Sequence, residues 1–102
     1  MARAPLSLDL DRDDARPYFL WDTTMTVGEL RGRLASADEE ERLLWIGRIL
    51  REARYQDVWA FVSIADLLSR WSRLRTRLGR KAAFWEFLLR KWSEHGLIPS
   101  PR

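Results

Sequence analysis

The sequence predicts an all-α fold, a compact single-domain bundle of four or five helices around a central C-terminal helix. Two observations favour this class. Ser or Thr followed three residues later by an acid occurs three times, and this spacing is the capping-box signature of a helix start. Apolar side chains also recur at helical spacing, most clearly as Ile64, Leu67, Leu68 and Trp71. The 102 residues are enough to bury one core, so a single domain is expected.

Three regions are expected along the chain. Residues 1–16 contain four aspartates and few large apolar side chains, which is typical of a flexible acidic N-terminal tail, although its alternating leucines could dock as an extended segment. Residues 17–96 form the helical domain, and residues 97–102 form a C-terminal tail.

No apolar run is long enough to span a bilayer. The aspartates also stand where a secretion signal would need an apolar segment. We therefore expect a cytoplasmic protein that does not act at a membrane.

The first half of the domain is predicted to hold an aromatic cluster and two helices. The cluster at residues 18–22 would close one end of the bundle or present an exposed anchor to a partner. A capping box at Thr26 starts a short first helix. A second box, at Ser36, starts a longer helix that ends near Arg54.

The second half is predicted to hold two further helices. The first begins at a capping box on Ser63, and the last runs from residue 80 to residue 95 and ends at Gly96. Residues 55–62 and 73–78 fit either a helical or an extended conformation. The apolar arc of the last helix covers roughly 200° of its circumference, wider than the stripe of an ordinary surface helix. This width places the helix at the centre of the bundle, with largely buried side chains at Trp85, Leu88 and Trp92.

The composition argues against an enzyme. There is no cysteine, the single histidine lies in the last turn of a predicted helix, and no glycine-rich phosphate loop or metal-ligand spacing is present. Catalysis needs a nucleophile beside a base, or convergent acids and bases. We therefore expect no catalytic residues, no cofactor and no metal site.

Charge is unevenly distributed along the chain. Residues 1–66 carry nine Arg and thirteen Asp or Glu, a net charge of −4, whereas residues 67–102 carry nine Arg or Lys and two Glu, a net charge of +7. The second half contains a stretch without acids, called here the basic segment, which consists of Arg70, Arg73, Arg75, Arg77, Arg80 and Lys81. Arginine binds phosphate and carboxylate groups in bidentate fashion. The segment could bind nucleic-acid phosphate, bind an acidic protein surface, or be a solvated face without a partner.

Aromatic residues supply a second set of candidates. Six tryptophans are many for a chain of this length. Tryptophan and arginine are the residue types that most often anchor protein interfaces. The candidate interface anchors are Trp21, Asp22 and Trp45.

Several segments carry a resemblance to a known family. They are Tyr18-Phe-Leu-Trp-Asp22, Ile49-Leu-Arg-Glu-Ala-Arg54 with Asp57-Val-Trp59, and Leu78-Gly-Arg80 before Phe84-Trp-Glu-Phe-Leu-Leu89. In this order, over about residues 18–92, they resemble short bacterial proteins often encoded beside nucleotidyltransferase toxins of the abortive-infection kind. Ser72 stands where that pattern has a proline. The resemblance implies an antitoxin-like or accessory partner, and it supplies no binding residues.

The leading hypothesis is a non-enzymatic protein-interaction module, an antitoxin-like or accessory partner that binds a nucleotidyltransferase-type enzyme encoded nearby and covers its acidic active-site rim. The runner-up is a DNA-binding transcriptional repressor that uses the basic segment in a helix-turn-helix variant. RNA is the other nucleic acid that the segment could bind. A homodimeric structural protein would have the same composition and stays open as a third reading.

Overall fold

The structure is a computed structural model that describes residues 5–99. Within that range the chain is mostly helical, with five α-helices, three short 3-10 helices and one two-stranded parallel sheet. Residues 1–4 and 100–102, which belong to the two expected tails, lie outside the described residues. None of the helices in the described part is both long and apolar enough to cross a membrane.

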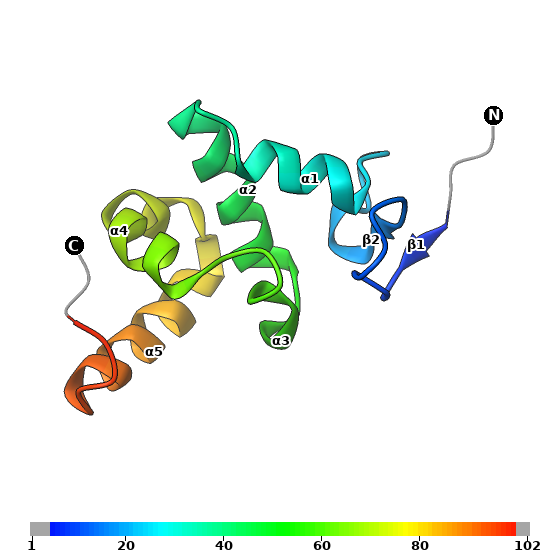
Figure 1. Cartoon of the computed structure of the whole chain (residues 1–102). Helices are drawn as coiled ribbons and strands as arrows, with labels where there is room; N and C mark the ends of the chain where they lie inside the picture. Colours follow the sequence, from blue (N-terminus) through cyan, green and yellow to red (C-terminus); the bar gives the residue numbers. More distant parts are fainter. Residues whose placement is uncertain (1–4, 100–102) are drawn as a thin grey trace.

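The segment before the aromatic cluster folds onto the domain, which matches the docking that its alternating leucines allowed and not the flexible tail expected from its acidic composition. Strand β1 (Leu6–Ser7) pairs in parallel with β2 (Arg16–Pro17) at one end of the molecule (Figure 1). The connecting residues place Leu10 in the core, where it is 8% exposed. The backbone N–H of Gly28 donates to the carbonyl of Asp13 at 2.9 Å. The two segments approach so closely here that a Cβ on Gly28 would lie only 3.3 Å from Asp13.

The first two α-helices begin at side-chain caps. Helix α1 (Val27–Leu34) follows the 3-10 helix η1 (Tyr18–Leu20), and the predicted capping box at Thr26 is confirmed. Helix α2 (Glu39–Glu52) is capped by Asp38, whose carboxylate accepts from the N–H groups of the first turn. The capping box predicted to begin at Ser36 is therefore wrong, because the nearer carboxylate takes the cap position.

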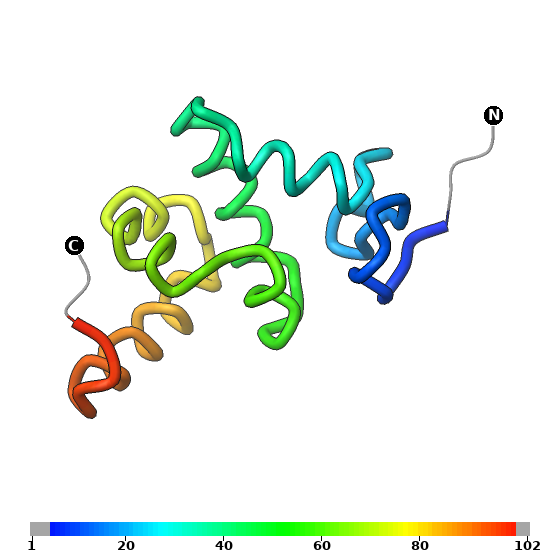
Figure 2. Tube along the Cα trace, in the orientation of Figure 1, coloured from blue at the N-terminus to red at the C-terminus, as the bar shows by residue number. Residues whose placement is uncertain are grey.

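The remaining elements follow in quick succession. Their bounds are α3 (Tyr55–Val58), α4 (Ile64–Leu74), η2 (Arg75–Arg77), η3 (Gly79–Lys81) and α5 (Ala82–Glu94). The capping box predicted at Ser63 is confirmed. Gly79 and Gly96 adopt positive φ angles of 53° and 69°, the left-handed conformation that glycine tolerates best. Of the two segments left open by the sequence, residues 73–78 are helical except at Leu78, whereas residues 55–62 form one helical turn, α3, followed by non-helical turns. The chain then turns between α4 and α5 (Figure 2).

Helix α2, and not the C-terminal helix, takes the central place. It packs against α1, α3, α4 and η3, whereas α5 lies at the end of the molecule opposite β1 and packs against η2 and η3 (Figure 1). The reason lies in the side chains, because α2 presents one broad buried face to these neighbours, made of Leu43, Ile46, Gly47, Ile49 and Leu50.

The inner side of α5 is fixed by a tryptophan. Trp85 is 1% exposed, as predicted, and its indole N–H donates to the carbonyl of Leu50 at 3.0 Å. Leu89 is equally buried, whereas Leu88 and Trp92 are partly buried. The burial of Trp85 and Leu89 turns the opposite side of α5 toward solvent.

The aromatic cluster is held to α3 by one hydroxyl group. The Tyr18 hydroxyl donates to Asp57 Oδ2 at 2.6 Å and accepts from the backbone N–H of Arg54 at 2.7 Å. Burial, together with the hydrogen bond to Asp57, raises the pKa of Tyr18 above its ordinary value. Phe19 and Leu20 of the cluster are buried and close one side of the domain, whereas Trp21 stays 59% exposed.

Candidate functional site

The basic segment divides into two rows with different surroundings. One row faces the acidic first turn of α2. Arg70 Nε donates to Glu39 Oε1 at 2.7 Å, and Arg70 Nη1 donates to Asp66 Oδ1 at 3.2 Å. Arg77 Nη2 donates to Glu40 Oε2 at 2.7 Å. These two arginines are structural, because their guanidinium groups tie η2 and α4 to the start of α2.

The acids of that first turn are satisfied within the chain. The pKa of Glu39 is lowered, first by the hydrogen bond from Arg70 and also by the nearby charge of Arg73. Glu41 accepts from Arg33 Nη1 at 2.6 Å, and this hydrogen bond lowers the pKa of Glu41. The opposite charges of the two halves of the chain therefore partly neutralise one another in the folded domain.

The second row faces solvent beside α5. Arg75, Arg80 and Lys81 are exposed, as is Arg73 at the edge of the first row. Arg75 Nη2 lies 3.8 Å from Glu86 Oε1, a loose contact between two half-exposed side chains. Of the six predicted cations, these four present their charge to the outside.

The outward side of α5 carries two phenylalanines among cations, a group that the sequence analysis did not single out. Phe84 is 43% exposed and Phe87 is 47% exposed. Lys81 Nζ lies 6.0 Å from the centre of the Phe84 ring, and Arg90 Cζ and Lys91 Nζ each lie 5.9 Å from the centre of the Phe87 ring. We call this group the α5 aromatic face, defined as Lys81, Phe84, Phe87, Arg90 and Lys91.

Trp21 and Asp22 lie together on a different part of the molecule. Trp21 is 59% exposed, and the guanidinium of Arg48 lies 5.5 Å from its ring centre. Arg48 donates to both carboxylate oxygens of Asp22, at 2.6 and 3.2 Å, and to the carbonyl of Phe19 at 3.1 Å. The hydrogen bonds from Arg48 lower the pKa of Asp22. The arginine is thus fixed by three acceptors beneath an exposed indole ring.

Leu44 belongs to this group, and Trp45 does not. Trp45 is partly buried and packs against the core, so it is a poor interface anchor. Leu44 is 54% exposed and lies one helical turn before Arg48 on α2. The sequence did carry a signal, because three consecutive apolar residues at 43–45 cannot all face inward on one helix. We call this group the Trp21 surface, defined as Trp21, Asp22, Leu44 and Arg48.

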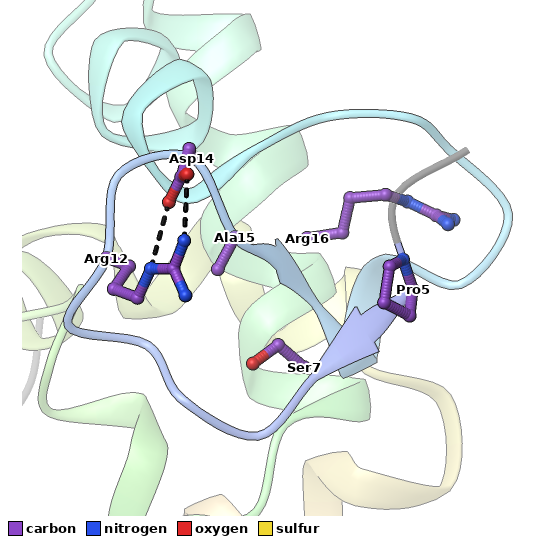
Figure 3. Close-up of a pocket in the computed structure, with 6 residues that line it drawn as sticks. All are labelled: Pro5, Ser7, Arg12, Asp14, Ala15 and Arg16. Carbon is purple, nitrogen blue, oxygen red and sulfur yellow. Dashed lines mark hydrogen bonds and ion pairs between the residues drawn. The ribbon is translucent and has the colours of Figure 1, made fainter. Parts of the chain in front are cut away.

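A shallow hollow of about 200 Å³ lies at the N-terminal end, lined by Pro5, Ser7, Arg12, Asp14, Ala15 and Arg16 (Figure 3). Arg12 donates to Asp14 through two hydrogen bonds, of 3.2 and 3.0 Å. Arg16 points away from this pair and donates to the carbonyl of Thr23 at 2.7 Å (Figure 3). The charges nearest the hollow therefore bond to the protein itself, and we assign no ligand to it.

Among residues 5–99, no group of three His, Cys, Asp or Glu side chains is placed to hold a metal ion. Comparisons of the chain with protein-family models, with curated proteins and with solved structures found no match. The candidate sites are therefore the two exposed surfaces, on η1 with α2 and on α5.

Proposed function

We propose that this chain is a non-enzymatic protein-interaction module that binds a partner protein through the Trp21 surface. The observation that carries the proposal is an exposed tryptophan whose ring centre lies 5.5 Å from the guanidinium of an arginine that the fold already holds in place. Asp22 and the Phe19 carbonyl fix Arg48 before any partner arrives.

Such an arrangement suits protein recognition for two reasons. Tryptophan and arginine dominate the residues whose loss weakens protein interfaces most. A side chain that is already ordered loses less conformational entropy on binding, so more of the contact energy contributes to affinity. Leu44 adds exposed apolar surface one helical turn before Arg48, and neither Trp21 nor Leu44 is needed to fill the core.

The partner class follows from the resemblance to antitoxin-like proteins encoded beside nucleotidyltransferases. The metal-binding carboxylates of such an enzyme would form an acidic rim. Arg73, Arg75 and Arg80 are exposed and could complement that rim, whereas Arg70 and Arg77 are held by carboxylates of this chain. Covering the rim would restrain the enzyme without any chemistry by this protein.

The repressor hypothesis ranks lower. Part of the basic segment pairs with acids of α2, and the outward residues early in α5 are Ala83, Phe84 and Glu86, which are poorly suited to reading the major groove. A homodimer built on the Trp21 surface would use the same residues as anchors. The size-exclusion measurement described below distinguishes it from the binding of a different partner.

The test is co-expression of the chain with the product of the neighbouring gene, followed by purification through a tag on one partner. We expect co-elution at a fixed ratio. Trp21→Ala should abolish it, and charge reversal at Arg75 and Arg80 should weaken it. The matched control is Phe87→Ala, which removes an exposed aromatic side chain from the other surface and should have no effect.

Two outcomes would contradict the proposal. One is a monomer that captures no partner and leaves the neighbour's activity unchanged. The other is a chain that forms a stable homodimer by size-exclusion chromatography, lost in Trp21→Ala, because the surface would then be occupied by a second copy.

A further inference from the structure

Helix α5 exposes two aromatic rings that its packing does not require. Trp85 and Leu89 fill the inner side, so Phe84 and Phe87 stand on the outer side, 43% and 47% exposed. At a rise of about 1.5 Å per residue, they lie about 4.5 Å apart along the helix axis. Phe84 still contacts the rings of Tyr55 and Trp85, at 6.1 and 5.3 Å.

Cations bracket the two rings. Lys81 lies over Phe84 on one side, and Arg90 and Lys91 lie over Phe87 on the other. The outermost of these residues are about 15 Å apart along the helix. Carboxylates balance the charge only in part. Glu94 lies 3.4 Å from Lys91 and 3.9 Å from Arg90, and Glu86 lies 3.8 Å from Arg75. Within residues 75–94 the two carboxylates are outnumbered by five exposed cations, which are Arg75, Arg80, Lys81, Arg90 and Lys91.

We propose that the α5 aromatic face binds single-stranded nucleic acid. A single strand offers a flat base and an anionic phosphate in every nucleotide, and proteins bind it by stacking bases on aromatic rings within a basic surface. Phe84 and Phe87 would each stack a base, while Lys81 at one end and Arg90 with Lys91 at the other would contact the flanking phosphates.

The geometry favours a single strand over the alternatives. In a duplex the base faces are covered by their neighbours, so the two rings would gain nothing from it. An acidic peptide would satisfy the cations but would leave the rings without an aromatic partner. This inference does not depend on the Trp21 surface, and the two proposals can fail separately.

The test is fluorescence anisotropy with labelled oligothymidylate and oligouridylate of about 15 nucleotides. A duplex of equal length and a labelled polyglutamate peptide serve as competing probes. We expect the single strands to bind most tightly at about 50 mM salt and to weaken as salt is raised. Replacing Arg90 and Lys91 by Gln should reduce the slope of log affinity against log salt by about 1.4, since each phosphate contact on a single strand contributes about 0.7.

Matched variants separate stacking from a general loss of surface. Phe87→Ala should weaken single-strand binding by about tenfold, as expected for the loss of one stacked base. Ile64→Ala removes a similarly exposed apolar side chain from α4 and should leave binding unchanged. The double change of Arg12 and Arg33 to Gln lowers the net charge by the same amount as the Arg90 and Lys91 pair, and it should leave the salt slope unchanged. Circular dichroism melting of each variant confirms that it is folded.

The proposal is overturned if the single strands give no anisotropy change at about 50 mM salt. It is also overturned if the duplex or the polyglutamate peptide binds as tightly as the single strands, or if folded Phe87→Ala binds like the unchanged protein. Loss of partner capture in Trp21→Ala with intact oligonucleotide binding would support both proposals independently.

Discussion

Arg70 Nε lies 2.7 Å from Glu39 Oε1, and this contact joins the middle of α4 to the first residue of α2. The Arg70 side chain is only 13% exposed, so the pair is shielded from solvent on the arginine side. The two residues are 31 positions apart in the sequence. A cation that looked available for a partner is therefore part of the internal structure of the domain.

We expect Arg70→Gln to lower the free energy of unfolding by about 1–3 kcal/mol, because it removes charge-assisted hydrogen bonds to two carboxylates. Urea denaturation of the variant measures the change. Arg75→Gln is the matched control. Its partner lies at 3.8 Å and its side chain is 55% exposed, so a change below about 0.5 kcal/mol is expected. Equal effects of the two substitutions would contradict the division of the basic segment into two rows.

The two adjacent leucines of α5 should differ in their contribution to stability. Leu89 is 1% exposed, so Leu89→Ala should cost about 2–5 kcal/mol through lost burial and the cavity left behind. Leu88 is only partly buried, and Leu88→Ala should cost clearly less. Thermal melting of both variants checks this order. A larger loss in Leu88→Ala would mean that α5 packs with a different rotation about its axis.

The Tyr18 hydroxyl should be a measurable link between η1 and α3. Tyr18→Phe removes the donor to Asp57 and the acceptor for the Arg54 N–H while keeping the ring. We expect a loss of about 1–2 kcal/mol, at about 1 kcal/mol for each hydrogen bond. Denaturant unfolding gives the value. Tyr55→Phe is the control, since the Tyr55 ring is 44% exposed and makes its contacts through its faces and edges. If Tyr18→Phe left the free energy of unfolding unchanged, the two hydrogen bonds of this hydroxyl would contribute nothing to stability.

Acid should destabilise the fold in part through three carboxylates that accept from arginines eight or more positions away. The hydrogen bonds from Arg48, Arg70 and Arg33 lower the pKa values of Asp22, Glu39 and Glu41. A carboxylate whose pKa is lower in the folded state stabilises that state above its unfolded pKa. This contribution is lost as the pH falls through the folded pKa. The urea midpoint should therefore be steady above about pH 5 and fall below about pH 4.

Glu39→Gln identifies one source of that acid sensitivity. The variant lacks one of the three titrating groups, so its stability should start lower at neutral pH and fall less steeply on acidification. Unfolding curves at several pH values, compared with those of the unchanged protein, give both quantities. An identical pH profile in the two proteins would contradict the role given to the Arg70–Glu39 pair.

Local sequence was sufficient for the features that depend on near neighbours. The capping boxes at Thr26 and Ser63 and the left-handed Gly96 all involve groups within a few turns of one helix. Their chemistry is complete before any tertiary contact forms. The mostly helical class followed from these signals alone. The cap of α2 was misplaced only because two side chains, those of Ser36 and Asp38, compete for it within three residues.

Only the tertiary structure decided which surfaces remain available. The apolar arc of α5 is too wide to show which part faces inward, and the contacts of Trp85 with Leu50 and the α3 rings settle its rotation. The same holds for the arginines. All six cations of the basic segment look alike in the sequence, yet Arg70 and Arg77 meet carboxylates 31 and 37 residues away, while Arg75 and Arg80 meet solvent. Charge and apolarity are properties of a residue, but exposure depends on which distant segment packs against it.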